Sequence, residues 1–242
     1  MMTVATVEDM NLAGVLNYEL CAYPPALFES QTLLRKADNP QLAHAILKMC
    51  GNLCTADVPE TQANVQYVLD GGYLLHVPWK PGDTYHKIAN SYANITFHNS
   101  GRAIVVFNGY DSATSIKDMS HRRCITSNIS NTVTFISGMK FVRQKENFLA
   151  NYTNKQHIIM LISEALMKIG CTVQHIDGDA DFDIVHSAVS SSQIIMTITV
   201  GEDTDLLILL LHHAKNNGIK LYVWSDIRRG LSTNPVYDIL GI

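Results

Sequence analysis

The chain has 242 residues, of which 47% are hydrophobic and 17% charged, and its formal net charge at pH 7 is −4. These values predict a soluble globular protein with a substantial core. The longest apolar run, Leu206 to Leu211, is too short to cross a bilayer, so we expect no membrane contact. The N-terminus lacks the basic start and apolar core of a secretory signal, which predicts a nuclear or cytoplasmic protein with reduced cysteines.

Residues 1–60 are predicted to form a mostly helical N-terminal extension. Pro40 is a typical first helical residue, Gly51 is a typical stop, and the apolar residues between them fit one helix face. A linker over residues 55–61 leads to the main domain, residues 61–242. The extension contains no chemical motif, so we expect it to pack, to bind a partner protein or to mediate self-association.

Apolar, β-branched runs in the main domain predict five buried strands, which cover Val65–Leu69, Ala103–Phe107, Cys171–Ile176, Ile194–Val200 and Lys220–Trp224. Helical patterns separate these strands. Two of the patterns cover Thr84–Asn94 and Asp181–Val189; a third is capped by Asn154 and ends at Gly170, and a fourth begins at Leu206. Strands that alternate with helices predict an α/β domain with a mainly parallel central sheet flanked by helices.

Polar side chains follow four of the predicted strands. Asp70 and Asn108 come directly after the first two. Two acidic clusters follow the next two strands and consist of Asp177, Asp179, Asp181 and Asp183, then Glu202, Asp203 and Asp205. Ligands of parallel sheets bind at the carboxyl ends of the strands, and carboxylates gathered there need positive charge nearby. The pattern predicts one or two Mg²⁺ or Mn²⁺ ions. The alternative is a set of solvated loops with helix N-caps.

A basic segment lies between the second strand and the helix that begins near Asn154. From Lys117 to Lys155 the only acidic residues are Asp118 and Glu146. A segment of this kind can follow a phosphate backbone despite the negative net charge of the chain, although it is also compatible with an ordinary solvated face. The candidate phosphate-binding residues are Lys117, His121, Arg122, Arg123, Lys140 and Arg143.

Taken in order, these motifs resemble the flap-endonuclease and PIN-like superfamily of nucleases. VLDGGYLLH is similar to the early strand of that family that ends in a metal-site Asp, here Asp70. VVFNGY is similar to the VFDG motif of the second strand, with Asn108 in place of Asp. The family's E-A-E motif resembles Asp179-Ala180-Asp181, and its T-x-D-x-D motif resembles Gly201–Asp205.

The resemblance covers roughly residues 62 to 226, and five motifs occur in the family's order. Lys117, Arg122 and Arg123 are similar in order and approximate spacing to the lysine and paired arginines that contact phosphates in flap endonucleases. The segment between Arg123 and the Asn154 helix is short, and 37 residues follow Asp205, which leaves little room for the family's duplex-gripping helix-turn-helix. The comparison therefore favours a compact PIN-like or 5′-nuclease-like domain.

The resemblance implies a metal-dependent nuclease that hydrolyses phosphodiester bonds in single-stranded or branched DNA or RNA with two metal ions. The implied metal ligands and catalytic residues are Asp70, Asn108, Asp179, Asp181, Asp203 and Asp205. Asn108 keeps an acceptor oxygen but lacks the negative charge of Asp, which predicts weakened or abolished activity; the sequence leaves open whether this residue is the natural one. The alternative function is a catalytically inactive, nuclease-like scaffold that binds nucleic acid or a partner protein.

Overall fold

The computed structural model describes residues 28–30, 33–34, 41–43, 45–46, 65–109, 131–177, 180–214, 220–224 and 236–239. The chain divides into two compact units, Met1–Gln41 and Leu42–Ile242. In the first unit, β1 (Phe28–Ser30) pairs with β2 (Leu33–Leu34) in antiparallel fashion. Residues 41–43 and 45–46 are helical, within the helix expected after Pro40. The predicted boundary at residue 60 lies outside the described residues, so the helical extension stays a prediction.

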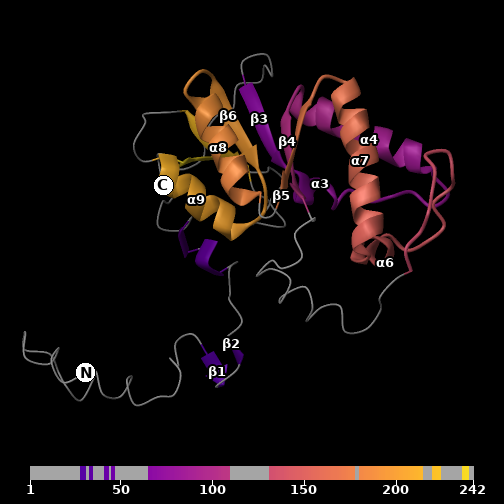
Figure 1. Ribbon diagram of the computed structural model, residues 1–242. Helices are drawn as coiled ribbons and strands as arrows, with labels where there is room; N and C mark the ends of the chain where they lie inside the picture. The colour runs from indigo at the N-terminus through magenta and orange to yellow at the C-terminus, as the bar shows by residue number, and fades with distance from the viewer. Residues whose placement is uncertain are drawn as a thin grey trace, which may run out of the picture. The chain divides into compact units, whose positions relative to one another are not determined.

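The second unit is built on a six-stranded sheet in the order β5-β4-β3-β6-β7-β8 (Figure 1). Its strands are β3 (Val65–Asp70), β4 (Ile104–Gly109), β5 (Thr172–Asp177), β6 (Met196–Val200), β7 (Leu221–Trp224) and β8 (Val236–Asp238). Neighbouring strands pair in parallel from β5 through to β7, and β8 is antiparallel to β7. The predicted α/β class with a mainly parallel sheet is confirmed, whereas β8 had not been predicted.

Helices cover both faces of this sheet. They are α3 (Gly71–Leu74), α4 (Tyr85–Ser100), α6 (Lys145–Ala150), α7 (Tyr152–Lys168), α8 (Asp181–Ser192) and α9 (Thr204–Ala214). Helices α4 and α7 pack together, as do α8 and α9, and the two pairs lie on opposite sides of the strands (Figure 1). Among the described residues, none of the helices has the length and apolar character that a bilayer crossing requires.

Alternate residues of the central strands supply the two cores. Leu69 and Val105 belong to the core under α4 and α7, whereas Val68 and Val106 belong to the core under α8 and α9. All four side chains are at most 2% exposed. A strand that is buried on both faces needs apolar residues at consecutive positions, which explains why these strands appear in the sequence as continuous apolar runs.

Two boundaries differ from the sequence-based prediction. Asn151, not Asn154, caps α7: its side chain accepts a hydrogen bond from the Asn154 backbone N–H at 3.1 Å. Asn154 is fully buried inside the helix and holds the preceding loop, because its Oδ1 accepts from the Val133 N–H at 2.7 Å. Ile194 lies in the turn after α8 and is 90% exposed, so the fourth strand begins two residues later, at Met196.

The first strand of the sheet along the chain, β3, lies between β4 and β6. The chain leaves β3 through α4 on one face, and it leaves β6 through α9 on the opposite face. Because these connections diverge, the carboxyl ends of β3 and β6 form a topological switch point, the position at which doubly wound sheets bind ligands. Asp70 and the cluster from Glu202 to Asp205 follow these two strand ends.

Candidate functional site

Asp70 lies at the junction between β3 and the short helix α3. Its Oδ1 accepts a hydrogen bond from the Gly72 backbone N–H at 2.7 Å, which fixes the carboxylate at the end of the strand. A Cβ added at Gly201, the residue after β6, would lie 3.5 Å from the Asp70 Cβ and 2.6 Å from Leu206 Cδ2. Gly201 therefore allows the backbone that leads into the second acidic cluster to pass directly against Asp70.

The second acidic cluster surrounds the start of α9. Asp203 Oδ1 accepts a hydrogen bond from the Asp205 backbone N–H at 3.1 Å, so Asp203 acts as a helix cap, as the alternative interpretation of the sequence expected. Asp205 lies in the first turn of α9, where the helix dipole favours a negative charge. A capping role and a metal-binding role are compatible, since the second carboxylate oxygen can still act as a ligand.

Asp181 occupies the equivalent position in the neighbouring helix α8, in its first turn. Asp181 and Asp205 line the same depression of about 380 Å³, together with Phe182, Ile208 and Leu209. Residues from the two acidic clusters, separated by β6 in the sequence, are therefore brought to one surface by the packing of α8 against α9.

Asp70 and Asn108 lie on the same face of the sheet as these two helices. Residues paired in parallel strands point to the same face, and Asp70 pairs with Val106 while Asn108 pairs with Ile176. Val106 and Ile176 both pack in the core under α8 and α9. Because each of these helices follows a strand end directly, its first turn lies at the carboxyl edge of the sheet. We call this set, Asp70, Asn108, Asp181, Asp203 and Asp205, the acidic edge.

Oxygen ligands of this kind suit a hard divalent cation such as Mg²⁺ or Mn²⁺. Within the described residues, however, no group of three or more His, Cys, Asp or Glu side chains is close enough together to hold a metal ion. The predicted ligand Asp179 lies outside those residues, so the complete predicted set is not represented among them. The acidic edge therefore has the right donor chemistry and a common location, and the metal remains a prediction.

Two of the six predicted phosphate-binding residues, Lys140 and Arg143, are described, and both are exposed. Lys140 forms an isolated antiparallel bridge with Thr84, the residue that caps α4. Helix α4 covers the face of the sheet opposite α8 and α9, so Lys140 lies beside the helix of the other face. The other four residues, Lys117, His121, Arg122 and Arg123, lie outside the described residues.

A Ser–His pair elsewhere in this unit has a structural role. Ser163 Oγ lies 3.1 Å from His175 Nε2, but this hydroxyl is 2.8 Å from the Ile159 carbonyl oxygen, to which it donates. The His175 ring stacks on Phe107 at 5.7 Å between centroids, and partial burial lowers the pKa of this imidazole. Since the serine proton is already donated to the helix backbone, this pair does not form a nucleophile and its base.

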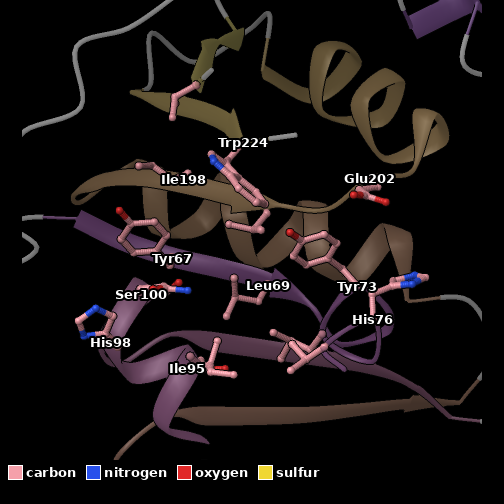
Figure 2. Close-up of a pocket in the computed structure, with 16 residues that line it drawn as sticks. Tyr67, Leu69, Tyr73, His76, Ile95, His98, Ser100, Ile198, Glu202 and Trp224 are labelled. Atoms are coloured by element: carbon pink, nitrogen blue, oxygen red, sulfur yellow. The ribbon is translucent and has the colours of Figure 1, made fainter. Parts of the chain in front are cut away.

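The sequence did not reveal a groove on the opposite face of the sheet, beside α4. Its volume is about 920 Å³ (Figure 2). The lining residues are Tyr67, Leu69, Tyr73, Leu74, His76, Val77, Ile95, Thr96, His98, Asn99, Ser100, Ile198, Val200, Glu202, Trp224 and Val236. We call this the aromatic groove. The sequence LYVW in β7 indicates two aromatic residues on one face of a strand. The sequence around it does not indicate which rings of other helices and strands they contact.

No protein-family model matches this chain, and comparisons with curated proteins and with solved structures also return no match. Its function is therefore argued from its own residues.

Proposed function

We propose that this protein is a metal-dependent nuclease of the PIN-like and flap-endonuclease type, which hydrolyses phosphodiester bonds in DNA or RNA and is weakened by Asn108. The observation that carries this proposal is the acidic edge. Asp70, Asp181 and Asp205 come from three elements far apart in the sequence, yet they share one face and one edge of a parallel sheet. That edge adjoins the switch point where such sheets bind ligands.

In the proposed site, Asp70, Asp181, Asp203 and Asp205 would hold Mg²⁺ or Mn²⁺ together with Asp179 and Asn108. A divalent cation bound there supplies Lewis acidity and lowers the pKa of water for attack on phosphorus. The protein's own residues keep the carboxylates in position: the Gly72 N–H holds Asp70, and the Asp205 N–H holds Asp203. Lys140, Arg143 and the basic residues from Lys117 to Arg123 would neutralise the phosphate backbone and orient it for in-line attack.

Asn108 makes this proposal testable in a single substitution. Both the chain and its Asn108→Asp variant would be incubated with end-labelled single-stranded, duplex and flapped DNA and RNA, in Mg²⁺, Mn²⁺ or EDTA. We expect the Asp variant to cut at least about tenfold faster, since a carboxylate restores a charged metal ligand, and we expect EDTA to abolish cutting. Product lengths would distinguish endonuclease from exonuclease activity.

A pair of matched variants separates a metal-site role from a general effect of acidic charge. Asp181 and Asp183 both lie in the first turn of α8, but only Asp181 lines the depression shared with Asp205. In the Asn108→Asp background, Asp181→Asn should lose cleavage and Asp183→Asn should retain it. Equal loss in both variants would contradict the proposed site.

Two observations favour the second candidate function, a nuclease-like scaffold without catalytic activity. One is the amide at position 108, and the other is that the described acids form no group able to hold a metal ion. If neither the chain nor its Asn108→Asp variant cleaves any substrate, while either still binds a nucleic-acid strand in a gel-shift assay, the scaffold is the better explanation.

A further inference from the structure

The aromatic groove lies between the sheet and the C-terminal half of α4. Four adjacent strands contribute its sheet side, through Tyr67 of β3, Ile198 of β6, Trp224 of β7 and Val236 of β8. Figure 2 shows Tyr73, His76 and Glu202 at one end and Tyr67, His98 and Ser100 at the other. Its volume of about 920 Å³ falls within the range of small-molecule sites, roughly 300–1,000 Å³.

The side chains that line the groove favour a flat, uncharged ring. Tyr67, Tyr73 and Trp224 supply ring surfaces, and the Tyr73 and Trp224 rings meet edge to face with centroids 5.6 Å apart. Among the described residues that line the groove there is no lysine or arginine, and the one carboxylate is that of Glu202. An aromatic ring would find stacking partners there that tolerate any base.

Thr96 adds a polar group to this groove. Its side chain is 2% exposed, and its hydroxyl has no hydrogen-bond partner among the described residues. A buried hydroxyl without a partner is costly, and such groups in folded proteins call for an explanation, such as a ligand. Tyr67 adds a phenol hydroxyl, which is protonated at neutral pH and able to donate; burial raises the pKa of this group further.

The groove reaches the carboxyl edge of the sheet. Glu202 lies at one of its ends, directly before Asp203 of the acidic edge, and Tyr73 follows Asp70 by three residues. The two sites therefore adjoin across the ends of β3 and β6, one on each face.

We propose that the aromatic groove binds an unpaired nucleobase of the nucleic-acid strand that the acidic edge acts on. The inference rests on the proposed function and adds a base-binding site to it; a base that is paired in a duplex must first be unpaired and unstacked, which costs a few kcal/mol. Tyr67 and Trp224 stack on the base, and Thr96 bonds one of its polar edge atoms. The protein therefore selects single-stranded DNA or RNA.

Intrinsic fluorescence provides a direct test in EDTA, where no cleavage takes place. The chain has two tryptophans, and the ring of the other, Trp79, packs on Phe141 and Phe148 with centroids 4.6 and 5.7 Å away, outside the groove. Single-stranded dA10, the same strand annealed to dT10, and adenosine would be titrated into the full chain. We expect a saturable change with dA10 and with adenosine, and at least about tenfold weaker binding of the duplex. Trp224→Phe should remove the signal while equilibrium dialysis still detects binding.

Two substitutions at Tyr67 form a matched pair. Tyr67→Leu removes the stacking ring but fills the site, and it should weaken dA10 binding by about tenfold. Tyr67→Phe keeps the ring and should leave binding within about twofold. Equal affinity for dA10 and the duplex, or equal binding by the two variants, would overturn the proposal. Circular dichroism of both variants would verify that they fold.

These outcomes are separable from those of the nuclease test. Binding to the groove is measured without metal and so does not depend on cleavage. If Asn108→Asp does not cleave but dA10 still binds in the groove, only the catalytic proposal is contradicted. If Asn108→Asp cleaves, and adding Tyr67→Leu changes neither KM nor the preference for unpaired strands, the groove proposal falls and the nuclease stands.

Discussion

The acidic edge and the aromatic groove lie on opposite faces of one sheet and were recognisable to different degrees. The acidic edge consists of residues at the ends of strands and in the first turns of the helices that follow them, and such positions can be identified one motif at a time. The groove is formed by side chains from four strands and two helices, and its aromatic residues Tyr67 and Trp224 belong to none of the motifs. Sites at strand ends can thus be found locally, whereas sites on a sheet face depend on strand order.

The largest expected effect would separate the two regions by function. In the Asn108→Asp background, Asp205→Asn should lower the cleavage rate by about 100-fold, a typical cost of removing one group that stabilises charge in the transition state. Binding of dA10 in EDTA should be unchanged, because Asp205 lines the depression beside α8 and not the groove. The measurements are single-turnover cleavage and the fluorescence titration. Parallel losses in both would mean that the two regions are one site.

Gly201 lies where the two regions meet, so its replacement tests the close packing there. Gly201→Ala should lower the free energy of unfolding by about 1–3 kcal/mol, because the new Cβ would overlap the Cδ2 of the buried Leu206. Urea denaturation would measure the change. Gly138→Ala is the control, since a Cβ there meets no atom within 4 Å. A Gly201→Ala protein as stable as the control would show that the edge is looser than described.

A pair of buried threonines distinguishes the faces more finely. Thr96 lines the groove and Thr199 lies in β6, and neither hydroxyl has a partner among the described residues. Replacing either by valine removes an unsatisfied polar atom at nearly constant volume, so each variant should gain about 1 kcal/mol of stability. Only Thr96→Val should weaken dA10 binding, by about tenfold, the usual loss for one hydrogen bond. Weaker binding by Thr199→Val instead would assign the base to another location.

The smallest effect concerns pH and involves neither region directly. Partial burial lowers the pKa of His175 below its unfolded value, so the unfolded chain binds more protons between those two pKa values. The stability contributed by the neutral imidazole is therefore fully present above the pKa that His175 has in the unfolded chain. It is lost as the pH falls toward the lower pKa that His175 has in the folded protein. Solvent screening limits the loss to less than about 1 kcal/mol.

His175→Gln tests this pH effect. Chemical denaturation at pH 7.5 and 5.5 should show a smaller drop in stability for His175→Gln than for the unmodified chain. His86→Gln, on the exposed surface of α4, is the control and should behave like the unmodified chain. A drop that is unchanged in His175→Gln would assign the pH dependence to other groups.

Amino-acid sequence by itself determined the class of fold and the composition of the acidic edge. Continuous apolar runs mark strands that are buried on both faces, and acids or glycines mark their ends, so both signals lie within a few residues of one another. Local signals also caused the errors. Asn151 and Asn154 both have the side chain of a helix cap, and only the contact of Asn154 with Val133 shows that it is a buried helical residue.

Only the tertiary structure decided which strands are neighbours, which residues face the same side and where a cavity remains. The order β5-β4-β3-β6-β7-β8 brings Tyr67 beside Ile198 and places Trp224 one strand farther along. A shift of one residue in the register of β6 or β7 would turn those side chains to the other face. The register depends on pairing between separate segments, such as β3 and β6, which lie more than a hundred residues apart, and no pattern within one segment specifies it. The acids of the edge could therefore be named from the sequence, but the groove could not.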